Sequence, residues 1–317
     1  MAEFSLIDRI RARAAAHGRA DVVLGIGDDA ALLQPPPGRQ LVVAMDTLND
    51  GVHAPTGTAA ADLGWKALAV NLSDLAAMGA DPAWCTLSLS LPAADPAWID
   101  GFLDGFLALA GRAGIALVGG DTTRGPLSVS VAVHGLVEPG RALRRDGARV
   151  GDAVWASGTL GAAAGALAQW RAGGPVDPAL RARLDRPDPR LALGRALAGA
   201  ATACIDVSDG LLADLAHVCA ASGVGARVEV DALPGAALLR ARFDAAAVRA
   251  LQATGGDDYE LCFTAPAGAA PAVEAAAAAA GVPVTRVGTV VAGSGVEAVD
   301  GAGRRWQPPR AGHEHFA

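Results

Sequence analysis

The sequence has a single lysine, Lys66, among its 26 basic residues. A P-loop requires a Gly-Lys-Ser/Thr triplet, and no such triplet occurs, so the chain is not a Walker-type nucleoside triphosphatase. No apolar run is long enough to span a bilayer. The N-terminal segment carries Glu3 and Asp8 and predicts an amphipathic helix, not a signal peptide.

Cysteine and positive charge are also scarce. The four cysteines contain no close pair, which argues against a zinc site or a disulfide framework and predicts a reducing, cytoplasmic compartment. The net charge of −7 argues against a nucleic-acid-binding protein. An acidic protein can still bind phosphates if metal ions mediate. The 317 residues, 52% of them hydrophobic, suffice for two domains of ordinary size.

What the sequence does contain is a series of aspartates beside glycines. The first is the stretch Gly25-Ile26-Gly27-Asp28-Asp29-Ala30, which follows an apolar run. Adjacent carboxylates repel each other unless cations lie between them, so the stretch is either a metal-binding loop or a polar hairpin turn. Its glycine spacing also fits a dinucleotide-binding turn. We reject that interpretation because Pro35-Pro36-Pro37 leaves no room for the helix that such a turn needs.

Two later aspartates follow apolar strands. Asp46 is expected at the end of a strand over 41–45, and Asp121 in a glycine-rich turn after a strand over 115–118. Asp206 and Asp209, on either side of Ser208, come after a third short strand. In that segment, Ser208 or Asp209 is either part of a binding site or only the cap of the following helix.

The spacing of apolar residues predicts a helix over 58–78 that is largely buried. Asn71 and Asp74 lie on its apolar face. A buried carboxylate without a partner is costly, so Asp74 pairs either with a cationic side chain or with a metal ion. Side-chain pairing is the commoner case in proteins, and the other aspartates favour a metal.

The remaining pattern predicts a mixed α+β fold with hairpins rather than a parallel sheet. The polar, glycine-containing segment 138–152 marks a boundary between domains 1–138 and 139–317. Residues 173–189 are expected to be a proline-rich connection, and the alanine run 275–280 a surface helix. Further helices are expected at 5–17, 96–112, 160–170, 190–201 and 211–221, and strands at 85–91, 127–137, 153–156 and 259–264.

Five segments together carry a family resemblance: 25–30, 66–80, 119–125, 206–210 and Gly255-Gly256-Asp257-Asp258-Tyr259-Glu260-Leu261. With them the chain closely resembles the thiamine-monophosphate kinase family of the aminoimidazole ribonucleotide synthetase-like superfamily, nearly end to end. The resemblance implies a two-domain fold. The N-terminal mixed-sheet domain binds ATP and Mg²⁺ and forms a barrel across a homodimer, with a C-terminal α/β domain beside it.

The resemblance also implies a phosphotransferase. ATP would phosphorylate thiamine monophosphate to thiamine diphosphate, the last step of thiamine diphosphate biosynthesis, with several Mg²⁺ ions and with a monovalent cation as an open possibility. No covalent catalytic residue is implied. The implied metal ligands are Asp29, Met45, Asp46, Asp74, Asp121, Asp206 and Asp209, the implied nucleotide contacts are Gly120, Asp121, Arg145 and Ser208, and the implied substrate contacts are His53, Asp257 and His313.

The chain departs from the family pattern at three places. Ala44 and Met45 replace hydroxyl residues before Asp46, so a metal contact there must use the Met45 carbonyl. Asp257 replaces a glutamate and reaches one methylene less far. His313 replaces an aromatic ring and offers less stacking surface.

The implied chemistry fits an all-carboxylate site. A phosphomonoester has a second pKa of ~6 and is largely dianionic at neutral pH, so the attacking phosphate oxygen needs no general base. The difficulty is bringing two polyanions together, for which Mg²⁺ held by carboxylates is suited. Two rivals remain open: another ATP-using enzyme of the superfamily that forms an acyl or imidate phosphate, and a non-catalytic regulatory module that binds magnesium and nucleotide.

Overall fold

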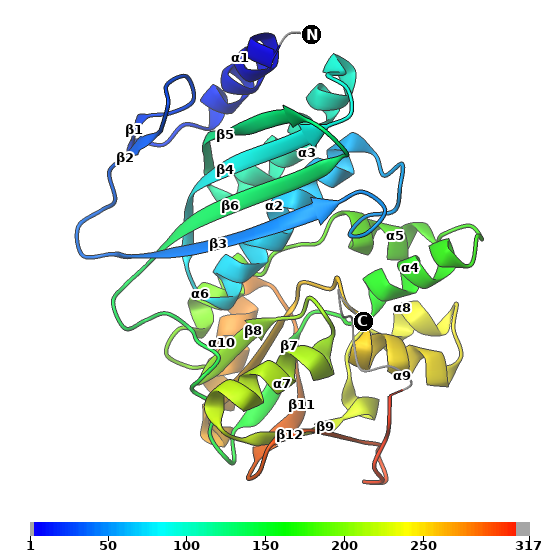
Figure 1. Cartoon of the computed structure of the whole chain (residues 1–317). Helices are drawn as coiled ribbons and strands as arrows, with labels where there is room; N and C mark the ends of the chain where they lie inside the picture. The colour runs from blue at the N-terminus through cyan, green and yellow to red at the C-terminus, as the bar shows by residue number, and fades with distance from the viewer. Residues whose placement is uncertain (1–2, 309–317) are drawn as a thin grey trace. The chain divides into compact units, whose positions relative to one another are not determined.

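The computed structural model describes residues 3–308, with only the backbone described for residues 3–5. The chain divides into two compact units. The first contains the residues up to Leu75 and those from Ala80 to Gly140, and the second contains Ala76–Gly79 and the residues from Arg141 onward (Figure 1).

The first unit is built on a four-stranded sheet with strand order β3-β6-β4-β5. The pair β4·β5 is parallel and is joined through helix α3, whereas the other two pairs are antiparallel. In Figure 1, α2 and α3 lie along one face of this sheet. The elements are α1 (Glu3–Ala14), η1 (Ala15–His17), β1 (Val22–Leu24), β2 (Leu32–Leu33), β3 (Gln40–Asn49), α2 (Ala60–Ala77), β4 (Asp81–Leu91), α3 (Pro96–Ala113), β5 (Ala116–Arg124) and β6 (Ser128–Val137).

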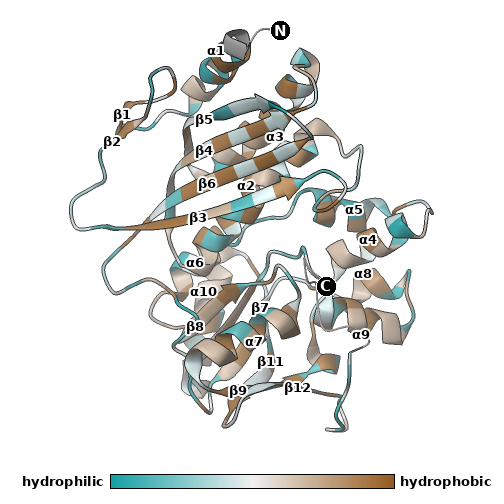
Figure 2. Cartoon of the chain, viewed as in Figure 1, coloured by the Kyte–Doolittle hydropathy of each residue, from teal (hydrophilic) through white to brown (hydrophobic). Residues whose placement is uncertain are grey.

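Alternation along the strands separates the two faces of this sheet. On β6, Val129, Val131 and Val133 are buried, whereas Ser128 and Ser130 are only half-buried. Successive side chains of a strand point to opposite faces, so one face is apolar and the other, here called the hydroxylic face, carries these serines. Figure 2 shows the resulting bands of hydrophobic and hydrophilic residues along β4 and β6.

The two long helices of this unit approach each other at backbone contact. A Cβ atom added at Gly64 of α2 would lie 2.1 Å from the Phe102 carbonyl oxygen. A Cβ atom added at Gly105 of α3 would lie 1.7 Å from the Ala61 carbonyl oxygen. Glycine at both positions is therefore a packing requirement.

The second unit is built on a six-stranded sheet with strand order β12-β9-β11-β7-β10-β8, antiparallel except for β12·β9. Its elements are β7 (Ala153–Ser157), α4 (Ala162–Arg171), α5 (Pro178–Asp185), α6 (Leu191–Leu197), β8 (Ala203–Asp206), α7 (Leu211–Ser222), β9 (Gly225–Glu229), η2 (Val230–Ala232), α8 (Ala236–Arg240), α9 (Ala245–Thr254), β10 (Leu261–Ala265), η3 (Ala267–Ala269), α10 (Ala270–Ala280), β11 (Val284–Val291) and β12 (Gly295–Val299).

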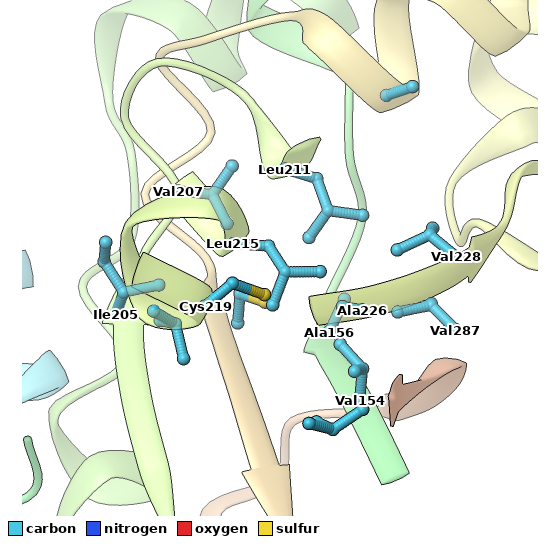
Figure 3. Packing of buried hydrophobic residues seen from close by; sticks show 14 of the residues in the cluster. Val154, Ala156, Ile205, Val207, Leu211, Leu215, Cys219, Ala226, Val228 and Val287 are labelled. Carbon is cyan, nitrogen blue, oxygen red and sulfur yellow. The ribbon is translucent and has the colours of Figure 1, made fainter. Parts of the chain in front are cut away.

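Both faces of the six-stranded sheet are covered. Val154 and Ala156 of β7 pack in a cluster with Leu215 and Cys219 of α7, as Figure 3 shows. The alternate β7 residue Trp155 belongs to a second cluster, on the other face of the sheet. Strands buried on both faces read as continuous apolar runs, as β7 and β10 do.

The mixed sheets confirm the predicted fold class, and three local expectations are wrong. Strands β3 and β5 continue past 45 and 118, so Asp46 and Asp121 lie inside strands, because backbone pairing persists through their polar residues. Segment 173–189 contains α5, which Asp177 caps by accepting from the backbone N–H of Ala179. The surface helix predicted over the alanine run 275–280 is confirmed as part of α10, and one side of it, with Ala276 and Ala277, packs in the second cluster.

No helix within residues 3–308 is both long and apolar enough to cross a membrane.

A pair of glycine substitutions in α3 tests the helix contact. Gly105→Ala should lower the free energy of unfolding by ~1–3 kcal/mol, because its methyl group meets backbone that cannot move aside. Gly101→Ala is the control: its methyl group would lie 3.4 Å from the Ala60 Cβ atom, and helix propensity should stabilise it by up to ~1 kcal/mol. Urea denaturation of both variants measures the difference. Equal stabilities would contradict the backbone contact.

Candidate metal and phosphate site

In the first unit, Asp46 lies on β3, an edge strand of the sheet. Its backbone N–H donates to Asn71 Oδ1 at 2.9 Å, and the Asn71 amide nitrogen donates to the Ala67 carbonyl oxygen, also at 2.9 Å. Asn71 is fully buried on α2 and therefore ties the strand edge to the helix. Asp46 remains accessible to solvent, but the protein packed around its carboxyl group raises the pKa of that group by desolvation.

Asp74 lies one helical turn beyond Asn71 and is half-buried. Residues three apart on a helix share a face, so Asp74 and Asn71 are presented on the same side of α2. The helix thus brings one carboxylate to the side where it also holds the Asp46 backbone. This places two of the predicted ligands, Asp46 and Asp74, on neighbouring elements of the same unit.

The turn after β3 is held by the only lysine of the chain. Lys66 is 2% exposed, and its Nζ donates to the His53 carbonyl oxygen at 2.9 Å. The His53 Nδ1 accepts from the Asn49 backbone N–H at 3.0 Å. Both contacts fix the position of the half-buried His53, a predicted substrate contact, relative to α2.

Asp121 lies on the opposite edge of the same sheet. It is exposed on β5, and the strand register aligns it with Ser88, Ser130 and Thr47 in one row across the hydroxylic face. The Thr47 and Ser130 hydroxyl oxygens lie 2.7 Å apart. Three strand spacings of ~4.8 Å separate β3 from β5, roughly 14 Å in all. The unit by itself therefore does not bring Asp46 and Asp121 to one ion.

The neighbouring Gly120 has a structural reason to be glycine. Its φ is +152°, and an added Cβ atom would lie 1.8 Å from the Leu87 carbonyl oxygen. Met45, another predicted ligand, is 66% exposed on β3.

The acidic stretch 25–30 forms the connection of a two-stranded hairpin between β1 and β2. A strand and not a helix follows it, which agrees with our rejection of the dinucleotide-binding turn. Asp28 and Asp29 are both exposed, and the Asp29 backbone N–H donates to Asp28 Oδ1 at 2.8 Å. The hairpin leaves both carboxylates accessible for an ion.

In the second unit, two distant segments pair and bring predicted site residues together. The Asp257 N–H donates to the Ser208 carbonyl oxygen at 2.8 Å, and the Tyr259 N–H donates to the Val207 carbonyl oxygen at 2.8 Å. The Val207 N–H donates in turn to the Glu260 carbonyl oxygen. Since Asp206 and Asp209 flank this pairing, a predicted substrate residue lies beside predicted metal and nucleotide residues.

The segment that carries Asp257 is strained and tightly enclosed. Asp257 and Tyr259 have φ values of +66° and +51°, the only positive values among the described non-glycine residues. A Cβ atom added at Gly256 would lie 2.3 Å from the Ser208 carbonyl oxygen. Such conformations cost of order 1–3 kcal/mol each and persist where surrounding contacts enforce them, often at functional sites.

Two carboxylates next to this segment, the buried Glu260 and the half-buried Asp258, are held by hydrogen bonds. Glu260 is 2% exposed; it accepts from the Ser157 hydroxyl at 2.5 Å and from the Arg190 Nε at 2.7 Å. The Asp258 carboxyl accepts from the Gly161 backbone N–H at 2.6 Å, at the start of α4. Burial, with the charges of Glu260 and Asp257, raises the pKa of Asp258 well above its usual value.

Asp214, on the first turn of α7, was not predicted as a site residue. It is 3% exposed, and its Oδ2 accepts from the backbone N–H groups of Ser208, Asp209 and Gly210 at 3.0, 3.1 and 3.1 Å. Burial, together with the charge of Asp206, raises the pKa of Asp214 to about 7. The sequence does carry one signal for it, an acidic residue early in a helix, where acids are generally favoured.

Arg145 is exposed beside the edge strand β8. The Cys204 N–H donates to the carbonyl oxygen of the preceding Arg144, and the Ser222 hydroxyl donates to the Arg145 carbonyl oxygen. These contacts hold the backbone of Arg145 on the strand that ends at Asp206. The predicted substrate residue His313 lies outside the described residues.

The donor chemistry fits magnesium. Every side-chain ligand predicted is a carboxylate, the donor that Mg²⁺ prefers. No group of three or more His, Cys, Asp or Glu residues close enough to hold a metal ion occurs within residues 3–308. The ligand set therefore stays a prediction.

Comparison with known proteins identifies the family of the chain. Residues 27–137 match the family "AIR synthase related protein, N-terminal domain", and residues 149–301 match "AIR synthase related protein, C-terminal domain". Thiamine-monophosphate kinase of Salmonella typhimurium is 48% identical over 300 residues, which cover 92% of this chain and 90% of that protein. The chain belongs to the thiamine-monophosphate kinase family.

Solved structures of the family share the whole fold. Thiamine-monophosphate kinase from Stenotrophomonas maltophilia K279a is similar with a TM-score of 0.87 and 56% identity, over 94% of this chain and 96% of that one. The structure described as "AaThiL complexed with AMPPCP and TMP" has a TM-score of 0.78 and 31% identity, over 99% of this chain and 97% of that one.

A pH dependence of stability follows from the enclosed Asp258. A carboxyl whose pKa is raised by folding destabilises the folded state increasingly as pH rises above its unfolded value. Asp258→Asn keeps an acceptor for the Gly161 N–H and removes the charge. The melting temperature of the variant relative to wild type should therefore rise between pH 5 and pH 8.

Asp300→Asn is the control for this measurement. The Arg304 side chain lowers the pKa of Asp300, so its stabilisation is complete above the unfolded pKa and should be constant from pH 5 to pH 8. Scanning calorimetry at both pH values compares the variants. A pH-independent offset for Asp258→Asn would show that its carboxyl is not desolvated.

Proposed function

We propose that this protein transfers the γ-phosphoryl group of ATP to thiamine monophosphate and forms thiamine diphosphate, the last step of thiamine diphosphate biosynthesis. One observation carries the proposal: backbone hydrogen bonds join the Val207–Ser208 segment to the Asp257–Glu260 segment. Candidate nucleotide, metal and substrate residues are thereby adjacent in one unit. Family membership and the relative described with AMPPCP and TMP support the same reaction.

In this reaction the carboxylates would hold cations between two polyanions, ATP and thiamine monophosphate. We assign Asp46 and Asp74 as the principal metal ligands of the first unit, together with Asp29, Asp121 and the Met45 carbonyl, and Asp206 and Asp209 as the metal ligands of the second unit. Bound Mg²⁺ would neutralise phosphate charge and favour an in-line geometry. Whether a monovalent cation joins them is left to experiment.

The chain positions both substrates without covalent chemistry. Arg145 supplies a fixed positive charge for nucleotide phosphates, and Ser208, Gly120 and Asp121 complete the nucleotide contacts. His53 and Asp257 position thiamine monophosphate, together with His313. Thiamine carries a permanently cationic thiazolium ring, and a carboxylate such as Asp257 is complementary to it. The Tyr259 hydroxyl donates to Asp257 Oδ1 at 3.2 Å, a contact that orients this carboxylate in the structure without substrate.

The outer face of β3 supports a homodimer. Leu41, Val43 and Met45 are 51%, 58% and 66% exposed on this edge strand. Exposed apolar side chains on an edge strand favour contact with a second sheet, and we propose that two copies join their four-stranded sheets there. The reaction is assigned to the cytoplasm, where ATP is available and where the four buried, free cysteines stay reduced.

Substitution of the candidate ligands tests the kinase reaction. Asp74→Asn and Asp121→Asn should each lower the turnover of ATP and thiamine monophosphate by about 10²-fold or more, because each removes a carboxylate at the phosphates. Thiamine diphosphate and ADP are measured together by chromatography. Asp104→Asn, on the exposed side of α3, is the control and should keep the wild-type rate.

Near-normal rates in either ligand variant would remove that residue from the site. Wild-type protein that binds ATP and Mg²⁺ but forms no thiamine diphosphate would overturn the kinase proposal and favour a regulatory module.

A charge on the strand edge tests the dimer. Val43→Asp should shift the molar mass measured by light scattering from two copies to one, since a carboxylate would be desolvated in a sheet-to-sheet contact. Val150→Asp, at a position 60% exposed in the second unit, is the matched control and should leave the mass unchanged. A dimer that persists in Val43→Asp would place the contact elsewhere.

A further inference from the structure

Three consecutive backbone N–H groups converge on one oxygen atom at the start of α7. The donors are Ser208, Asp209 and Gly210, and the acceptor is Oδ2 of Asp214, at 3.0–3.1 Å from each nitrogen. Asp214 belongs to the same helix and is 3% exposed. Its carboxyl oxygen is thus an internal acceptor enclosed by the loop that precedes the helix.

Free N–H groups at a helix start ordinarily form a binding site for an external anion such as a phosphate. In this loop the donors are already used, and the acceptor is shielded from solvent. Phosphate groups therefore cannot be bound by these three N–H groups. The loop can contact a metal–nucleotide complex only through its side chains and its remaining carbonyl groups.

The other side of the loop is fixed as well. The Ser208 carbonyl oxygen accepts from the Asp257 N–H, so both backbone polar groups of Ser208 are engaged within the protein. Gly210 has a φ of +116°, and a Cβ atom there would lie 2.7 Å from the Thr254 carbonyl carbon. With its backbone held on two sides, the loop can present Ser208 and Asp209 in only one direction.

We propose that Asp214 is a positioning residue, whose carboxylate takes the place of a bound phosphate at the start of α7 and orients Ser208 and Asp209 toward the metal–nucleotide complex. Asp214 acts through the loop and touches neither ATP nor metal. The proposal depends on the proposed function only for the identity of the ligand.

Three substitutions separate the hydrogen bonds of Asp214 from its charge. Asp214→Ala removes the acceptor and leaves three enclosed N–H groups without it. Asp214→Asn removes the same charge but keeps an oxygen at the same place, so the difference between these two variants reports the hydrogen bonds. Asp214→Glu keeps the charge and moves the carboxylate by one methylene, away from the donors.

The measurement is the affinity of a non-hydrolysable ATP analogue with Mg²⁺, by isothermal titration calorimetry in the absence of thiamine monophosphate. Residues that orient metal ligands typically change affinity by about 10–100-fold when removed, so Asp214→Ala should weaken binding at least about 10-fold. Asp214→Asn should stay within about threefold of wild type, because the acceptor remains. The affinity of Asp214→Glu for the analogue should be lowered as much as that of Asp214→Ala.

Asp152→Ala is the matched control. Asp152 is 5% exposed and accepts from the Arg149 N–H at 3.0 Å and the Thr202 hydroxyl at 2.7 Å. The register pairs Ala153 with Ala265 and Asp206 with Leu261, so Asp152 lies at the opposite end of the sheet from the loop. This variant should lose melting temperature, as Asp214→Ala does, and keep the wild-type affinity for the analogue.

Equal affinity of Asp214→Ala and Asp214→Asn would overturn the proposal, because only charge would then matter. The proposal would also be overturned if Asp152→Ala weakened binding of the analogue as much as Asp214→Ala does, since a general loss of stability would then explain both losses of affinity. If Asp214→Ala does not fold, the comparison of Asp214→Asn with Asp214→Glu decides, and tighter binding by the glutamate variant refutes the proposal. Wild-type protein that binds the analogue but phosphorylates no thiamine monophosphate would refute the kinase proposal alone.

Discussion

Repulsion between neighbouring carboxylates is the constraint on which this structure depends. In the second unit, burial of Asp214, together with the charges of Asp206 and Asp209 close to it, raises the pKa of Asp214 and disfavours its ionisation. Asp214 is compensated by three backbone N–H groups, and Glu260 by Arg190 and Ser157. Asp214 and Glu260 are thus compensated by the protein itself and serve as scaffold, whereas the exposed residues Asp29 and Asp121 are accessible to cations.

This division of carboxylates explains how a protein without a P-loop can bind nucleotide phosphates. A P-loop presents backbone N–H groups to the phosphate, but here a helix start directs the same kind of donor toward its own Asp214. The outward side of the loop then offers oxygen atoms, which under the proposed function would meet phosphate through cations. An acidic chain with one lysine is consistent with that solution.

In the first unit, buried polar side chains, and not a strained backbone, hold the candidate site residues in position. Asn71 holds the edge of β3 beside Asp46, and Lys66 holds the turn at His53. Both side chains are almost wholly buried on α2. The helix therefore acts as a rigid support for the strand edge, and the glycine contact between α2 and α3 keeps it close to its neighbour.

The sequence by itself determined the fold class, the family and the candidate aspartates, because these depend on local periodicity and on motifs contiguous in the chain. It did not place Asp46 and Asp121 inside strands, since polar residues read as the end of an apolar run while backbone pairing continues through them. Nor did it find α5 in the proline-rich segment, where Asp177 and Pro178 begin a helix.

Only the tertiary structure decided which carboxylates are scaffold and which are available. Asp214 and Asp209 are the same residue type five positions apart, and nothing local separates their roles. Their difference arises because the backbone N–H groups of Ser208, Asp209 and Gly210 point inward to the carboxyl group of Asp214. It also arises because residues 257–260 form backbone hydrogen bonds with residues 207–208, about fifty positions earlier in the chain. Such contacts depend on how distant segments meet in space, which a local pattern of residues does not contain.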